Sequence, residues 1–169
     1  MNAWPIEDSV SMNAFYGNPD ANRDGLPDTS WEGENLMRVI PPYPMVLAWD
    51  ISTKVRTISI HKKCASSLAR VLKRIATEMS IDDINKYQLD RYGGAYMFRL
   101  MRGATALSVH SWGAAIDLSP GINSFGTDYG HKPNMMPMSV VRMFEEEGAT
   151  WGGLWRRGDA QHFQFAGIS

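Results

Sequence analysis

The chain has 169 residues, of which 44% are hydrophobic and 21% charged, and this balance predicts one folded domain rather than a disordered chain. A formal net charge of -1, without long basic runs, argues against a nucleic-acid partner bound by bulk charge. No stretch approaches the about 18 consecutive apolar residues of a membrane-spanning helix, so we expect no membrane partner.

The N-terminal quarter of the chain predicts irregular structure. Residues 1–42 are rich in Asn, Asp, Pro and Gly, and the prolines of "IPPYPM" (residues 40–45) favour an extended backbone. We expect this segment to pack on a compact domain that residues 43–169 form. Within that domain, "RTISI" (residues 56–60) alternates polar and apolar side chains as a strand does.

The clearest helix follows this strand. Its apolar residues recur every three or four positions, as on one buried helix face: Ala65, Leu68, Ala69, Leu72, Ile75, Ala76 and Met79. The only cysteine, Cys64, rules out an intramolecular disulfide and is expected to be a small buried residue on this helix. A second short helix is expected after it, with Ser80 as its N-cap and Asp83 three residues on.

Beyond Gly94 the pattern favours short strands separated by turns that contain glycine. They are expected at residues 95–100, 107–110, 114–118 and 162–166. A long loop (residues 119–138) and a helix capped by Ser139 and ended by Gly148 should separate the last two strands. The chain shows no repeat and no linker, so we predict an α+β fold in a single domain, with a small antiparallel sheet flanked by helices.

Two candidate metal ligands stand on either side of a turn in "SVHSWGAAIDL" (residues 108–118). The separation of His110 and Asp117 is odd, so on one continuous strand their side chains would point to opposite faces. A tight turn at Gly113 would let the two strand ends converge. A catalytic zinc site needs three protein ligands, commonly imidazole and carboxylate, and leaves a fourth position to water.

The third ligand should be a histidine, and three are available: His61, His131 and His162. His162 is the strongest candidate, because the two phenylalanines around it share the opposite face of its predicted strand. His131 lies in the long loop and is expected to be exposed. Asp159, three residues before His162, can supply the carboxylate that takes a proton from the water and returns it.

These residues fit a known motif. The pattern SxHxxGxAxD is filled here by Ser108, His110, Gly113, Ala115 and Asp117. It resembles a motif of the VanY-like zinc D,D-carboxypeptidases and L-alanyl-D-glutamate peptidases. That family's second motif, an acidic residue three positions before a histidine near a Trp-rich turn, is similar to residues 151–162. The resemblance covers roughly residues 41–165, is closest to the phage endolysin branch, and implies a Hedgehog/D,D-peptidase-like fold.

The resemblance assigns roles to the central residues. It implies that His110, Asp117 and His162 bind one zinc ion and that Asp159 is the general base. Aspartate at this last position resembles the endopeptidase branch, since the dipeptidase branch usually carries glutamate there.

The family also places an arginine before the first zinc motif, where its charge holds the substrate carbonyl oxygen. Arg99 matches best, on the strand predicted at residues 95–100, and Arg91 and Arg102 are alternatives. Ser108 is a candidate hydrogen-bond donor around the metal ligands, or a plain strand serine. Three tryptophans either wall the peptide cleft or pack in the core: Trp112, Trp151 and Trp155.

A second metal signal lies in "DANRDGLPD" (residues 20–28). It resembles a calcium-binding loop of the EF-hand type, with ligand positions filled by Asp20, Asn22, Asp24 and Asp28. The position that should hold a bidentate glutamate is Trp31, and Glu32 comes one residue later. The alternatives are a calcium ion that orders the N-terminal segment and a polar turn without metal.

The resemblance also implies a function. It implies a phage endolysin, an L-alanyl-D-glutamate-type endopeptidase that cuts peptidoglycan stem peptides. We expect the protein to be a monomer. "MNAWPIEDSV" lacks the basic and apolar regions of a secretory signal, so we expect synthesis in the host cytoplasm and action on the wall after release. Two alternatives remain: a D,D-carboxypeptidase that removes terminal D-alanine, and a non-catalytic wall-binding or virion structural domain.

Overall fold

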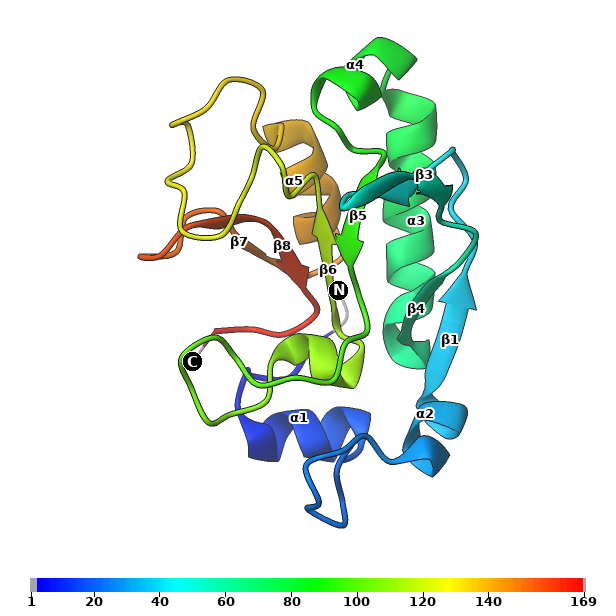
Figure 1. Ribbon diagram of the computed structural model, residues 1–169, viewed down its shortest axis with the longest axis vertical. Helices are drawn as coiled ribbons and strands as arrows, with labels where there is room; N and C mark the ends of the chain where they lie inside the picture. Colours follow the sequence, from blue (N-terminus) through cyan, green and yellow to red (C-terminus); the bar gives the residue numbers. More distant parts are fainter. Residues whose placement is uncertain (1–2, 169) are drawn as a thin grey trace.

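A six-stranded sheet forms the centre of the computed structural model, which describes residues 3–168 (Figure 1). The strand order is β3-β2-β5-β6-β8-β7, and every neighbouring pair is antiparallel except β2 and β5. The strands are β2 (Val46–Leu47), β3 (Asp50–Lys54), β5 (Arg91–Gly94), β6 (Ala115–Leu118), β7 (Thr150–Gly152) and β8 (Asp159–Gln164). The α+β prediction in a single domain is therefore confirmed, with one parallel pair in the sheet.

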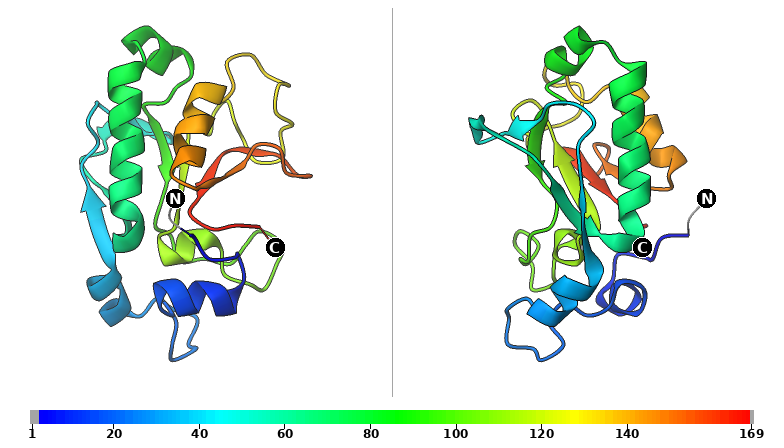
Figure 2. Two further views of the ribbon diagram at one scale, coloured as in Figure 1. Left: turned by 180° about the vertical axis from the view of Figure 1, so that it is seen from behind. Right: turned by 90° about the vertical axis from the view of Figure 1, so that its right-hand side faces the viewer.

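Two helices, α3 (Lys62–Glu78) and α5 (Met138–Glu146), cover the same face of this sheet (Figure 2). The predicted long helix is α3, and the predicted short helix is α4 (Ile81–Lys86), where Ser80 Oγ accepts from the backbone N–H of Asp83. A second sheet of two strands, β1 (Leu36–Val39) and β4 (Ile58–His61), packs against α3. None of the helices within residues 3–168 has the length and apolar character that a membrane span requires.

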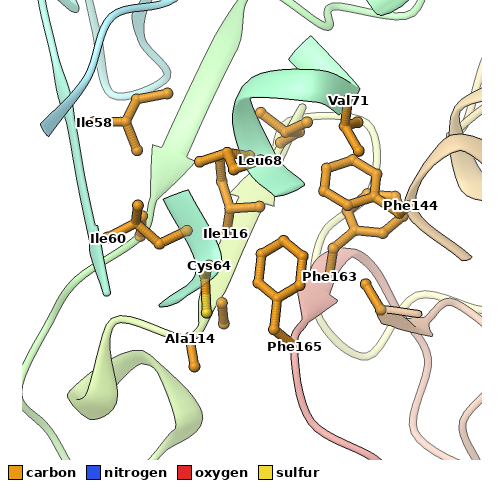
Figure 3. Close-up of a cluster of buried hydrophobic side chains, with 14 of the residues drawn as sticks. Ile58, Ile60, Cys64, Leu68, Val71, Ala114, Ile116, Phe144, Phe163 and Phe165 are labelled. Carbon is orange, nitrogen blue, oxygen red and sulfur yellow. The ribbon is translucent and has the colours of Figure 1, made fainter. Parts of the chain in front are cut away.

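The core lies between the sheet and these helices (Figure 3). Ile116 of β6 is paired with Phe163 of β8, and both side chains are fully buried against the helices. The ring of Phe163 stacks on that of Phe144 from α5, with centroids 3.9 Å apart. Cys64 is buried in the same core, and burial raises the pKa of its thiol to about 12. Because side chains alternate along a strand, the next residue of β6 and the preceding residue of β8 must point to the opposite face.

The structure differs from the sequence prediction for residues 1–42. That segment contains two helices, α1 (Ser9–Tyr16) and α2 (Thr29–Asn35), followed by strand β1. Isolated helices this short are marginally stable in water and form mainly through tertiary packing, which the local sequence does not show. Burial stabilises them here, because Met12, Tyr16 and Trp31 all belong to the core.

The strands predicted at residues 95–100 and 107–110 are wrong. Residues 95–99 form no strand, Leu100 and Leu107 make only an isolated bridge, and Val109–Trp112 is a 3-10 helix, η1. The two segments bond to each other, since Met97 N–H donates to His110 C=O and Ser108 N–H to Arg99 C=O. Ser111 Oγ also accepts from Arg99 N–H and donates to Arg99 C=O. Helix α5 begins at Met138, so its predicted cap residue lies inside its first turn.

Gly113 ends η1 and connects it to β6. Its backbone is left-handed (φ 61°), a conformation that favours glycine, and its carbonyl accepts from His61 N–H at 2.7 Å. A Cβ atom at this position would lie 2.8 Å from His61 N and 2.9 Å from Leu36 Cδ2. The glycine therefore allows η1 to pack directly against the strand pair β1–β4.

We expect Gly113→Ala to lower the free energy of unfolding by more than Gly25→Ala. Both glycines have left-handed backbones, which cost about 1–3 kcal/mol for a residue with a side chain. Only Gly113 adds a close contact, since no atom lies within 4 Å of a Cβ placed on Gly25. Chemical denaturation of both variants measures the difference. Equal losses of stability would show that the packing around Gly113 is not tight.

Candidate metal centre and its cleft

Three side chains meet on the face of the sheet opposite α3 and α5. They are His110 from η1, Asp117 from β6 and His162 from β8, and one ligand atom of each lies within 4.8 Å of the others. Asp117 Oδ1 is 2.9 Å from His162 Nδ1 and 3.3 Å from His110 Nε2. Both histidines are buried. Within residues 3–168 no other group of three such side chains has this geometry.

The sheet register brings two of these side chains together. Asp117 and His162 are directly paired across the antiparallel strands β6 and β8, so their side chains share one face. Gly93 of the neighbouring strand β5 leaves space for Asp117, because a Cβ on Gly93 would lie 3.0 Å from the Cβ of Asp117. The turn after η1 then places His110 beside the pair. Thus the structure brings together the three residues that the sequence motif singles out.

Hydrogen bonds determine which ring nitrogen of each histidine faces the carboxylate of Asp117. His110 Nδ1 lies 2.6 Å from the carbonyl oxygen of Ala95, and His162 Nε2 lies 2.9 Å from Gln164 Oε1. A carbonyl oxygen only accepts, so each of these nitrogens carries a hydrogen. The opposite nitrogens, His110 Nε2 and His162 Nδ1, therefore face Asp117 and are the ones available to a metal ion.

The carboxylate of Asp117 is kept charged. Burial by itself raises the pKa of this group, but the two imidazoles beside it outweigh burial, and the pKa lies below its ordinary value. For His162, burial lowers the pKa, yet the hydrogen bond and charge of Asp117 outweigh it and raise the pKa. The cluster thus combines a retained negative charge with two imidazoles, which suits a cation.

Asp159, at the start of β8, lines the same cleft as Asp117 and His162. Its carboxylate is 3.0 Å from the side-chain nitrogen of Gln161, which donates to it. Burial is the main cause that raises the pKa of Asp159 above its ordinary value. A half-buried carboxylate with a raised pKa is more readily protonated, which suits a group that takes up and gives back a proton.

Two of the three candidate arginines line the cleft and the third does not. Arg99 and Arg102 line the cleft, as does Ser108, whereas Arg91 lies on β5 and pairs with Asp90 at 3.0 Å. The predicted strand position of Arg99 is wrong, because the residue lies in an irregular segment before η1. Its guanidinium donates to the carbonyl of Leu100 at 3.2 Å.

The three tryptophans take different positions. Trp155 lines the cleft, and its ring centroid is 5.5 Å from that of His162. Trp112 is buried and donates to Asn13 Oδ1, and Trp151 is buried against Phe163. Of the three, only Trp155 faces the cleft.

The remaining histidines lie away from the cluster. His61 caps helix α3, where its Nδ1 accepts from Lys63 N–H, and its Nε2 is 3.1 Å from the carbonyl oxygen of Tyr16. His131 is exposed in the loop that precedes α5, as the sequence predicts.

Several side-chain oxygens of the possible calcium loop accept hydrogen bonds from the backbone of the same loop. Asp20 accepts from Asp24 N–H and Gly25 N–H, and Asp28 accepts from Ala21 N–H. Within the described residues, the acids of this loop do not gather into a three-ligand group. Calcium binding therefore stays a prediction, which a calorimetric calcium titration tests.

Sequence reasoning missed the residues that orient the two imidazoles. Ala95 acts through its carbonyl, for which the sequence carries no signal. The sequence does carry a signal for Gln164, because this residue follows His162 by two positions and so lies on the same face of β8. Glu7 also lines the cleft, and no sequence motif marks it.

Comparison with known proteins agrees with this geometry. Residues 102–165 match a family model described as D-alanyl-D-alanine carboxypeptidase. The matched segment includes the three converging side chains, His110, Asp117 and His162, and also Asp159. No curated protein and no solved structure matches the chain. The match supports a peptidase and covers only the C-terminal part of the chain.

We expect His110→Ala to weaken zinc binding by more than the 10–100-fold typical of losing a residue that only supports a ligand. The variant removes a nitrogen that faces the cluster, whereas His131→Ala removes an exposed imidazole and should leave the affinity unchanged. Competition with a chromophoric chelator measures both affinities. Equal affinity in His110→Ala and the unaltered protein would contradict this metal centre.

Proposed function

We propose that the protein is a zinc-dependent peptidase that hydrolyses an amide bond in peptidoglycan stem peptides, and that it acts as a phage endolysin. The observation that carries the proposal is the convergence of His110 Nε2, Asp117 Oδ1 and His162 Nδ1, with the carboxylate of Asp159 in the same cleft. The family match over residues 102–165 supports the peptidase assignment.

The donor set fits zinc. Two imidazole nitrogens and one carboxylate oxygen are ligands of catalytic zinc sites, which leave one position free for water or substrate. The hydrogen bonds to Ala95 and Gln164 direct the unused nitrogens of the two rings toward the same point. One zinc ion held by His110, Asp117 and His162 would supply Lewis-acid chemistry, making water a nucleophile near neutral pH and polarising the substrate carbonyl.

The other residues of the cleft would then handle the proton and position the substrate. A carboxylate oxygen of Asp159 takes a proton from the attacking water and delivers it to the nitrogen of the leaving amine. The guanidinium of Arg99, which lines the same cleft, would hold the substrate carbonyl oxygen as negative charge develops on it. The Trp155 ring supplies an apolar wall next to His162.

The bond that is cut distinguishes two candidate activities. Aspartate at position 159 favours an L-alanyl-D-glutamate-type endopeptidase through the resemblance described above. The description of the matching family model favours a D,D-carboxypeptidase that removes terminal D-alanine. Both activities use the same cleft, so the difference lies in how the substrate is bound. We also propose that the protein is a monomer, is made in the host cytoplasm, and acts on the wall after release.

We expect purified peptidoglycan treated with the protein to release new amino groups, and chelator to abolish this release. Mass spectrometry of the digest identifies the bond: loss of terminal D-alanine indicates the carboxypeptidase, and cleavage after L-alanine indicates the endopeptidase. Added zinc should restore the activity of chelated protein. Protein that binds the wall but releases no amines would instead be a non-catalytic binding domain.

We expect Asp159→Asn to lower kcat about 10²–10⁴-fold, because an amide cannot accept the proton. Zinc affinity should stay close to that of the unaltered protein, since Asp159 is not one of the three converging ligands. The control is Gln161→Ala, which removes the donor to Asp159 but leaves its carboxylate in place. Activity in Asp159→Asn equal to that of the control would assign the proton transfer to another group.

A further inference from the structure

Glu7 lies far from the metal motif in the sequence but lines the cleft that contains Asp117, Asp159 and His162. The backbone holds it there. Glu7 N–H donates to the carbonyl of Gly167 at 2.8 Å, and Gly167 N–H donates to that of Pro5 at 2.8 Å. These bonds attach the N-terminal segment to the chain that follows β8, as a short parallel bridge between Ile6 and Gly167. The segment lies outside residues 102–165, which match the family model.

The side chain of Glu7 is connected to His162 of the metal centre by hydrogen bonds through a single residue, Gln164. Gln164 Nε2 donates to Glu7 Oε2 at 2.8 Å, while Gln164 Oε1 accepts from His162 Nε2 at 2.9 Å. A second acceptor, the carbonyl of Ala166, lies 3.3 Å from the same amide nitrogen. Gln164 is almost completely buried, with 1% of its surface exposed, so its amide depends on these protein partners for its hydrogen bonds.

The orientation of the Gln164 amide decides which ring nitrogen of His162 is available to a metal ion. Two acceptors face one end of the amide, so the nitrogen must lie there and the oxygen must face His162. The ring then carries a hydrogen on Nε2 and presents Nδ1 to Asp117 and His110. With the amide reversed, its N–H would face His162 Nε2, and a neutral ring would keep its hydrogen on Nδ1, where it blocks the metal.

From these contacts we infer that Glu7 is a positioning residue of the metal centre, which fixes the Gln164 amide and thereby directs His162 Nδ1 toward the ion. The inference rests on the proposed zinc site. A carboxylate is a stronger acceptor than a neutral carbonyl, and the bond to Glu7 is shorter than that to Ala166. Glu7 is therefore the main support for this amide orientation.

Zinc affinity of the full chain, measured by chelator competition, tests the inference. We expect Glu7→Ala to weaken zinc binding by about 10-fold, the lower end of the effect of losing a partner that orients a metal ligand. Glu7→Gln should restore most of this loss, because its amide oxygen still accepts from Gln164. Glu34→Ala, which removes an exposed acid of α2, should leave the affinity unchanged. Thermal unfolding of the metal-free proteins checks that each variant is folded.

A second comparison separates orientation from charge. In a Gln164→Leu background, Glu7→Ala should cause no further loss of zinc affinity, because the connecting amide is gone. An equal loss in both backgrounds would show that Glu7 acts by its charge alone and would overturn the inference, as would full affinity in Glu7→Ala. If the unaltered protein does not bind zinc, or if His110→Ala leaves binding intact, the proposed metal centre itself is wrong and the inference fails with it.

Discussion

The pairing of β6 with β8 is the constraint on which the rest of the cleft depends. One register places Ile116 opposite Phe163 and Asp117 opposite His162. The first pair is buried against α3 and α5, and alternation sends the second pair to the other face. A shift of one residue would expose the two apolar side chains and bury the two polar ones without their partners. The hydrophobic core therefore holds the register that assembles the metal centre.

The β6–β8 register by itself brings together only the carboxylate of Asp117 and the imidazole of His162. Other contacts position His110 and orient both imidazoles. Gly113 turns the chain so that His110 arrives beside the pair, and its lack of a side chain allows the close contact with His61. Hydrogen bonds to Ala95 and Gln164 then select the nitrogen that each histidine turns inward. Such outer contacts commonly govern both the geometry of a metal site and the basicity of its ligands.

The N-terminal segment contributes side chains both to the core and to the cleft. Its helices α1 and α2 bury Met12, Tyr16 and Trp31 in the core. Before α1, the backbone bonds between Glu7 and Gly167 bring an acid to the edge of the cleft. The residues proposed for chemistry all come from the second half of the chain, but the support for one of them comes from its beginning.

The sequence by itself determined the α+β class, the helix α3 and strands β6 and β8, because these depend on periodicity and on local spacing. It also pointed to the three converging side chains, through motifs that resemble those of a known family. It did not determine the helices α1 and α2, which are short and are stabilised by long-range burial. Nor did it reveal η1, where Ser111 bonds to Arg99 in place of a sheet partner. Only the tertiary structure decided that Arg91 lies away from the cleft and that Glu7 lies within it, because both outcomes depend on contacts between segments far apart in the chain.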